Sequence, residues 1–415
     1  MSAERAQCPD LTPGRCPSSF KCHCTNALSR IRDDKAAVNR CRSSMSLGVL
    51  MDKLPESVLF FTRTRRVMTP LYRALSKIES RLLRSRLKRI DIIKPIYITG
   101  LPRSGTTILL EMLAQHPAAA SHRNYQYAQP YLPYWLDRIY PLVPLGEDRP
   151  FERVHKDKLT VTRTSPDVVE EIFWTTFFPS IHDESGSSVL DEKTRHPDFE
   201  RFYRNHIKKM LLSRGACRYL TKNNYNFSRT GYLSKLFPDA RFVFVIRDPV
   251  HHVAYYLKQD RLFNKLNDED PRWQDYLCGL GHREFGPARS IINLGDDGLV
   301  KQISEAWRAG QVVQACARYW NAVYLDIDAR LRADKDLAAR SLVLRYEDLC
   351  RDSANQIDRL LECCELDPEP FAKTKARYMQ RLAEPTYYRP DFNDSELSMI
   401  AELTGPAAER YGYAG

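Results

Sequence analysis

The chain has 415 residues, of which 43% are hydrophobic, so it is too long for one small domain and can bury a substantial core. No apolar run reaches the roughly 20 residues that a membrane-spanning helix needs, and the first residues lack the apolar region of a secretory signal. These features argue against an integral membrane protein or a secreted one and predict a soluble, cytoplasmic protein.

The net charge of +11 is concentrated in the first quarter of the chain. Residues 1–94 contain 20 Lys and Arg but only 8 Asp and Glu, which gives this part a net charge of +12 and leaves −1 for the rest. This distribution predicts a basic N-terminal arm and argues against a basic catalytic body. No nucleic-acid partner is therefore expected.

Residues 1–50 are rich in Pro, Ser, Arg and Cys and show no periodicity, which predicts a mostly disordered tail. Five of the 11 cysteines lie here, at Cys8, Cys16, Cys22, Cys24 and Cys41. They lack the paired C-x-x-C spacing of a zinc site, although Cys22, His23 and Cys24 leave weak metal binding open. We expect reduced thiols, no disulfides and no metal.

Residues 51–94 form the second part of the arm, and they predict a basic amphipathic helix. Apolar residues recur at helical spacing, and Lys and Arg fill the other faces. The apolar positions are Leu71, Leu75, Ile78, Leu82 and Leu87. The favoured interpretation is a helix packed on the body with a solvated basic face, and the alternative is a weak contact with a membrane surface or a polyanion.

From residue 95 onward, apolar strands alternate with helical patterns. The strands are expected within 95–100, 217–222, 240–249 and 339–349, and the helices within 105–117, 230–237, 250–263, 310–331 and 354–364. Such alternation predicts an α/β fold, with a central parallel sheet of about five strands flanked by helices. We interpret residues 95–415 as one catalytic domain, with an aromatic-rich insert at 117–215.

The segment from Gly100 to Thr107, "GLPRSGTT", follows the first strand and precedes a helix. Its two glycines and its last threonine keep the spacing of the phosphate-binding loop G-x-x-x-x-G-K-[ST], but Thr106 occupies the lysine position. Backbone N–H groups and the helix N-terminus can still form an anion cradle, and Arg103 can restore a positive charge. The missing lysine argues against ATP or GTP hydrolysis.

The stretch "GLPRSGTTILLEML" resembles the 5′-phosphosulfate loop of the sulfotransferases that use 3′-phosphoadenosine 5′-phosphosulfate (PAPS). This resemblance implies the sulfotransferase variant of the phosphate-loop fold and a reaction that needs no metal. It also implies that the loop binds PAPS and the product 3′,5′-adenosine bisphosphate (PAP). The loop residues it assigns to this binding are Pro102, Arg103, Ser104, Gly105, Thr106 and Thr107.

Two further motifs carry the same resemblance, which extends over roughly residues 95–365 and is closest to a bacterial-type branch. "FVFVIRDPVHHVAYYLKQ" resembles the 3′-phosphate motif, with Arg247 as the clamp and Tyr255 where the family usually has a serine. Lys222 ends a strand 25 positions before Arg247, and the family uses such a lysine to stabilise the bridging oxygen and the sulfate. Asn224 stands where the cytosolic branch has its catalytic histidine.

Sulfuryl transfer also needs a base for the acceptor, and the sequence leaves several candidates. We favour His155, which Asp157 is close enough to orient, ahead of Glu171 and then His122. Glu170 neighbours Glu171 on a helical pattern, so only one of the two can face the cleft. A structural histidine remains an equally good interpretation of each imidazole.

The sequence therefore predicts an enzyme that transfers a sulfuryl group from PAPS to a hydroxyl or amine of a small molecule. Aromatic residues of the insert are expected to contribute to the core and to wall an acceptor pocket. They are Tyr125, Tyr127, Tyr131, Tyr134, Trp135, Phe173, Trp174, Phe177 and Phe178. Two alternatives remain: a small-molecule or nucleotide kinase, and a non-catalytic PAP-binding protein. The acceptor and the oligomeric state are left open.

Overall fold

The computed structural model describes residues 54, 56–144, 146–157, 159–383 and 390–413. The expected disordered tail at 1–50, its five cysteines and its weak metal site lie outside these residues. In the part of the chain that is described, no helix combines the length and the apolar character needed to cross a membrane.

Five parallel strands form the central sheet, in the order β2-β5-β1-β6-β7. They are β1 (Ile96–Thr99), β2 (Ala119–Ala120), β5 (Arg218–Lys222), β6 (Arg241–Ile246) and β7 (Ser341–Arg345). The predicted α/β fold with a five-stranded parallel sheet is confirmed. A separate antiparallel hairpin, β3 (Phe151–Glu152) with β4 (Thr160–Val161), lies in the insert.

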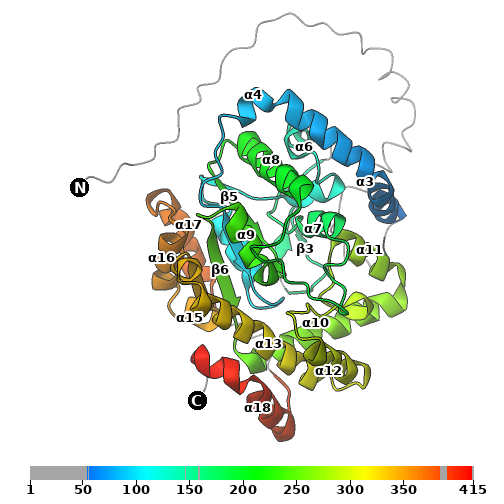
Figure 1. The fold of residues 1–415 in the computed structure, drawn as a ribbon, viewed down its shortest axis with the longest axis vertical. Helices are drawn as coiled ribbons and strands as arrows, with labels where there is room; N and C mark the ends of the chain where they lie inside the picture. Colours follow the sequence, from blue (N-terminus) through cyan, green and yellow to red (C-terminus); the bar gives the residue numbers. More distant parts are fainter. Residues whose placement is uncertain (1–53, 55, 145, 158, 384–389, 414–415) are drawn as a thin grey trace, which may run out of the picture.

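Helices cover the sheet (Figure 1). Along the chain they are α3 (Glu56–Leu82), α4 (Arg84–Leu87), α5 (Thr106–Leu113), α6 (Pro133–Ile139), α7 (Glu171–Phe177), α8 (Pro197–Arg214), α9 (Thr230–Leu236), α10 (Pro249–Glu269), α11 (Arg272–Leu280), α12 (Asp297–Arg308), α13 (Val312–Ala333), α14 (Lys335–Ala339), α15 (Tyr346–Arg351), α16 (Ser353–Cys364), α17 (Ala372–Arg381) and α18 (Asp394–Arg410).

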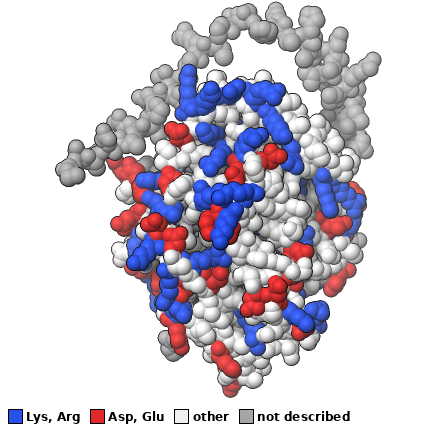
Figure 2. Space-filling view, viewed as in Figure 1, with Lys and Arg blue, Asp and Glu red and all other residues white. Residues whose placement is uncertain are grey.

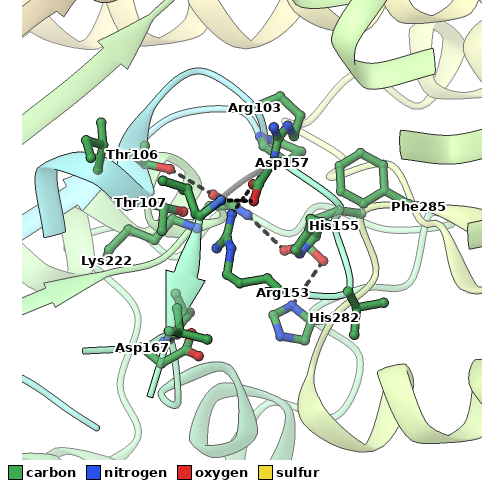
Figure 3. Close-up of a pocket in the computed structure, with 18 of the residues that line it drawn as sticks. Arg103, Thr106, Thr107, Arg153, His155, Asp157, Asp167, Lys222, His282 and Phe285 are labelled. Atoms are coloured by element: carbon green, nitrogen blue, oxygen red, sulfur yellow. Dashed lines mark hydrogen bonds and ion pairs between the residues drawn. The ribbon is translucent and has the colours of Figure 1, made fainter. Parts of the chain in front are cut away.

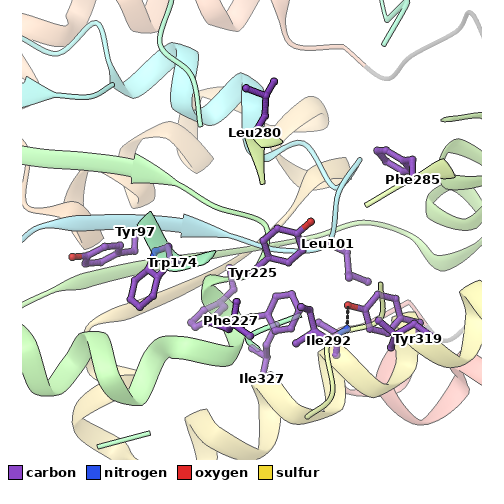
Figure 4. Close-up of a cluster of buried hydrophobic side chains, with 14 of the residues drawn as sticks. Tyr97, Leu101, Trp174, Tyr225, Phe227, Leu280, Phe285, Ile292, Tyr319 and Ile327 are labelled. Atoms are coloured by element: carbon purple, nitrogen blue, oxygen red, sulfur yellow. Dashed lines mark hydrogen bonds between the residues drawn. The ribbon is translucent and has the colours of Figure 1, made fainter. Parts of the chain in front are cut away.

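Alternate residues of the strands point into two separate cores, because successive side chains of a strand face opposite sides. Phe242 and Phe244 of β6 join the core that contains residues of α8, α9, α10 and α13, part of which Figure 4 shows. Val243 and Val245 join the second core, with residues of α5, α16 and α17. The sheet is thus buried on both sides, which explains the continuous apolar runs of its strands.

The basic arm is packed on the body through α3, as the favoured interpretation predicted. Glu79 of α3 and Lys209 of α8 form an ion pair of 2.7 Å, with side chains that are 0% and 1% exposed. Ser76 accepts a second hydrogen bond from Lys209 at 2.9 Å, and Glu79 also accepts from the backbone N–H of Trp135 at 2.7 Å. These contacts satisfy both buried charges.

We expect Lys209→Met to lower the free energy of unfolding by about 3–5 kcal/mol, because it leaves the Glu79 carboxylate buried without its cation. Urea unfolding followed by circular dichroism measures the change. The matched control is Lys301→Met at a side chain that is 75% exposed, with an expected change within about 0.5 kcal/mol. A Lys209→Met protein as stable as the control would show that the pair does not hold α3 in place.

Candidate active site

The functional groups predicted from separate motifs meet at the carboxyl edge of the sheet. The loop after β1, Lys222 at the end of β5, Arg247 after β6 and Tyr346 after β7 line one cavity of about 360 Å³. Parallel strands end at the same edge, so motifs far apart in the sequence become neighbours there. Of the predicted residues, the cavity is lined by Pro102, Arg103, Gly105, Thr106, Thr107, His155, Lys222 and Arg247.

Three residues of the loop have positive φ: Gly100, Arg103 and Gly105. Gly105 has φ 106°, and a Cβ atom there would lie 2.3 Å from the Tyr346 ring, so only glycine fits. Arg103 has φ 78°, which is costly for a residue with a side chain. Thr106 and Thr107, the first residues of α5, line the cavity, so the N-terminus of this helix lies beside it. Ser104 is fully buried and lies outside the cavity.

Arg247 is clamped between two aromatic rings. Its guanidinium carbon lies 4.3 Å from the ring centroid of Tyr255 and 4.6 Å from that of Tyr346. Its Nη1 donates to the backbone carbonyl of Arg103 at 3.3 Å. Tyr255 is only 1% exposed, is not among the residues that line the cavity, and stacks its ring on Arg247. The role of its hydroxyl group as a phosphate donor stays a prediction.

A second arginine comes from the β3–β4 hairpin, which lies over the loop (Figure 3). Arg103 and Arg153 both form ion pairs with Asp157, the first at 2.9 Å. Burial alone would raise the pKa of Asp157, but the two arginines hold it well below its usual value. Asp157 therefore orients the two arginines, whereas the sequence suggested that it orients His155.

The cavity fits a ligand with more than one anionic group. Five cationic residues line it: Arg103, Arg153, Lys222, Arg247 and Arg381. Among the described residues, the buried Nε atoms of Arg103, Arg153 and Arg247 have no hydrogen-bond partner. The cationic side chains that line the cavity can bind such anionic groups through charge-assisted hydrogen bonds.

His252 of α10 is a buried residue that the sequence interpretation missed. Neither of its ring nitrogens has a hydrogen-bond partner among the described residues. Burial and the charges of Arg247 and Arg103 lower its pKa to about 3, so the imidazole is neutral. His252 follows the Arg-Asp-Pro motif by about one helical turn. This spacing could have indicated that its imidazole lies near Arg247.

Lys222 lies inside the cavity, where burial lowers its pKa to about 8. The nearby Glu284 carboxylate opposes this effect, so the lysine stays largely cationic at neutral pH. Asn224 links Glu284 to the loop. Its amide nitrogen donates to Glu284 at 2.9 Å, and its amide oxygen accepts a long 3.5 Å hydrogen bond from Thr106. Thr106 is the residue in the lysine position of the loop.

His155 lines the cavity, and its Nδ1 lies 2.9 Å from the side-chain oxygen of Gln259. The Gln259 amide donates to the His155 carbonyl at 2.9 Å, which fixes the amide orientation and makes Nδ1 the protonated nitrogen. Burial, with Arg153 and Arg103, lowers its pKa to about 3. His155 is therefore neutral and only a weak proton acceptor.

Glu171 and His122 lie outside the cavity. Glu171 forms ion pairs with Arg229 at 2.7 Å and with His182 at 2.6 Å, and it accepts a hydrogen bond from Asn223. His122 is buried against His206, with 2.8 Å between their Nε2 atoms, and burial lowers its pKa to about 3. Both side chains have hydrogen-bond partners inside the core, and neither lines the cavity.

His282 is a base candidate that the sequence interpretation missed, and the glycine before it packs against Glu171. Gly281 ends α11 with φ 85°, and a Cβ atom there would lie 2.7 Å from the side chain of Glu171. The next residue, His282, lines the cavity, and its Nδ1 lies 3.3 Å from the carboxylate of Glu284. Burial lowers the pKa of His282, but Glu284 outweighs this effect and raises it above its usual value.

The remaining wall of the cavity is apolar. Among the insert aromatics, Tyr127 lines it, whereas most of the others belong to the core. The other apolar side chains come from α5, from the β3–β4 region and the segment after it, from α10 and α11, and from the segments after α11 and α17: Ile108, Phe151, Val154, Leu159, Val161, Val168, Phe263, Trp273, Tyr276, Leu277, Leu280, Phe285, Leu382 and Ala383. The sequence analysis sought the apolar wall within the insert at 117–215, whereas residues outside this range also line the cavity.

The model of the sulfotransferase family matches residues 95–275. This stretch holds the loop at Gly100–Thr107, Lys222 and Arg247, the same residues that carried the resemblance in the sequence. The match covers less than half of the 415 residues, and over this stretch it supports the predicted similarity to the sulfotransferase family. A search of the curated proteins gives no significant match.

Among solved structures, two bacterial sulfotransferases are similar to this chain. Sulfotransferase STF1 from Mycobacterium tuberculosis H37Rv is 15% identical with a TM-score of 0.43, and the match covers 80% of this chain and 81% of that one. Sulfotransferase STF9 from Mycobacterium avium is 14% identical with a TM-score of 0.46, with the same coverage of the two chains.

The His282–Glu284 pair can be tested without any ligand. We expect Glu284→Gln to lower the pKa of His282, because the neutral amide no longer stabilises the imidazolium. An NMR titration of protein with labelled histidines measures this change. The pKa of His251, which Asp248 raises through a 2.8 Å contact, should not move. An unchanged pKa of His282 would show that the pair does not form in solution.

Proposed function

We propose that the protein transfers a sulfuryl group from PAPS to a hydroxyl or amine of a small apolar acceptor and releases PAP, without a metal. The observation that carries this proposal is the convergence of Arg103, Lys222 and Arg247 on one cavity, beside a phosphate loop that has no lysine. This arrangement provides separate cationic groups for two anionic ends of a ligand. The lysine that a triphosphate would need is absent from the loop.

Each cation has a distinct role in the proposal. The loop amides and Arg103 bind the 5′-phosphosulfate end, and Arg247 binds the 3′-phosphate, held flat by its two tyrosine rings. Lys222 lies between the loop and Glu284 and stabilises the negative charge that grows on the leaving phosphate oxygen. PAPS supplies an activated sulfuryl group, and all groups that orient it belong to this chain.

His282 replaces His155 as our preferred general base. The base must accept the proton of the acceptor hydroxyl as the new oxygen–sulfur bond forms and the bond to the phosphate breaks. Glu284 contacts Nδ1 of His282, which leaves Nε2 to receive this proton, and the carboxylate raises the pKa of the imidazole, which makes it a better proton acceptor. The pKa of His155, about 3, makes it a much weaker acceptor of protons.

The donor is tested by thermal melting with PAP, PAPS, ATP with Mg²⁺, or buffer alone. A ligand at a hundred times its dissociation constant stabilises the protein by about 2.7 kcal/mol, which is visible as a rise in Tm. We expect this rise with PAP and PAPS. A rise with ATP and Mg²⁺ alone would mean that the cavity binds a triphosphate, and the proposal would be wrong.

Arg247→Met should weaken PAP binding by a factor of about 10 to 100, because it removes a charge-assisted hydrogen bond. Isothermal titration calorimetry measures the dissociation constant. Arg261→Met, at an exposed position of the same helix α10, is the control and should bind PAP as the unchanged protein does. Equal affinities of the two variants would exclude Arg247 from the PAP site.

His282→Ala should lower kcat for transfer to 2-naphthol by about 10² to 10⁴, with PAP binding unchanged, whereas His155→Ala should have a much smaller effect. Turnover should rise as the pH rises through the pKa of His282, because the base works in its neutral form. The Glu284→Gln variant should shift this rise to lower pH. Loss of turnover in His155→Ala with full activity in His282→Ala would reverse the assignment.

A further inference from the structure

The outward side of α3 exposes a line of large apolar side chains. Val67, Leu71, Ile78 and Leu82 are 77%, 46%, 46% and 70% exposed. Their spacing of four, seven and four residues places them on one stripe of a helix with 3.6 residues per turn. Exposed apolar residues that gather in one stripe mark an interaction surface, whereas single ones do not.

The opposite side of α3 packs against the rest of the protein. Arg65 is buried there, and it donates to the carbonyl oxygens of Tyr127, at 2.8 Å, and of Gly279. Glu79 forms its buried ion pair with Lys209 on the same side. The apolar stripe is therefore additional to the packing that holds the helix, and the described residues leave it exposed.

Basic residues accompany the stripe along its whole length and continue into α4. The exposed ones are Arg63, Arg66, Lys77, Arg81, Arg84, Arg86, Lys88 and Arg89. Glu79 is the single acidic residue between positions 57 and 90, and it is buried. Figure 2 shows Lys and Arg gathered over the end of the molecule where α3 and α4 lie in Figure 1.

We propose that this face, α3 with α4, docks on the surface of a membrane that contains anionic lipids. The helix lies in the plane of the interface, with the apolar stripe in the boundary between headgroups and acyl chains and the basic residues on the lipid phosphates. A second copy of the chain would bring two strongly basic faces together. A soluble polyanion would leave the apolar stripe without a partner.

The full-length protein is tested by sedimentation with sucrose-loaded vesicles. One set contains phosphatidylcholine mixed with phosphatidylglycerol, and the other contains phosphatidylcholine alone. We expect the protein to sediment with the anionic vesicles and much less with the neutral ones, and we expect high salt to weaken the binding because it screens the charges. Equal binding to both sets would overturn the proposal.

Two double variants separate the two components of the surface. Leu71→Ser with Leu82→Ser should lower the partition coefficient at least about tenfold, because inserted methylene groups are lost. Lys77→Gln with Arg81→Gln should lower it about 25-fold, since each cation near the surface contributes about fivefold. The controls are Leu142→Ser, at an 80% exposed side chain, and Lys265→Gln with Lys301→Gln, which should bind as the unchanged protein does.

The same variants distinguish a membrane from the two other possible partners of this face, a soluble polyanion and a second copy of the chain. If the charge variant loses binding and the apolar variant keeps it, the face binds a polyanion and the membrane proposal is wrong. If light scattering shows a dimer that the leucine substitutions dissociate, the face is an interface between two copies and the proposal is equally wrong. Melting curves of all variants check that the fold is intact, which is expected because the substituted side chains are exposed.

Discussion

The concentration of positive charge in one half-enclosed cavity is the constraint on which the rest of the site depends. Five cations around one cavity repel one another and destabilise the protein. The structure offsets part of this cost with Asp157, which is shared by Arg103 and Arg153, and with Glu284 near Lys222. An anionic ligand would balance the positive charge that remains on the cavity wall.

Aromatic rings take the place of further carboxylates around Arg247. The faces of Tyr255 and Tyr346 attract the guanidinium and exclude water from it, without neutralising its charge. A carboxylate in either position would compete with the ligand for the same donors. The tyrosine that departs from the usual serine of the family therefore has a physical role that needs its ring, and its hydroxyl group is not required for this role.

The sequence was sufficient to bring together the residues that lie at the ends of strands. The loop at Gly100–Thr107, Lys222 and Arg247 could be predicted because parallel strands end at one edge of the sheet. His282 could not be predicted, because its place depends on how the segment after α11 returns to the cavity. Glu171 has the residue type of a base, and only the tertiary structure reveals that Arg229 and His182 already bind its carboxylate.

Helix α3 connects the proposed membrane surface with the proposed reaction site. On its inner side Arg65 binds the carbonyl of Tyr127, which lines the cavity, and that of Gly279, which lies between the lining residues Leu277 and Leu280. The helix thus holds two parts of the apolar wall in place with one buried guanidinium. An acceptor that matches this wall is itself apolar and partitions into lipid. Docking of the outer face would place the enzyme where such an acceptor is concentrated, so the two sides of one helix would serve the same substrate.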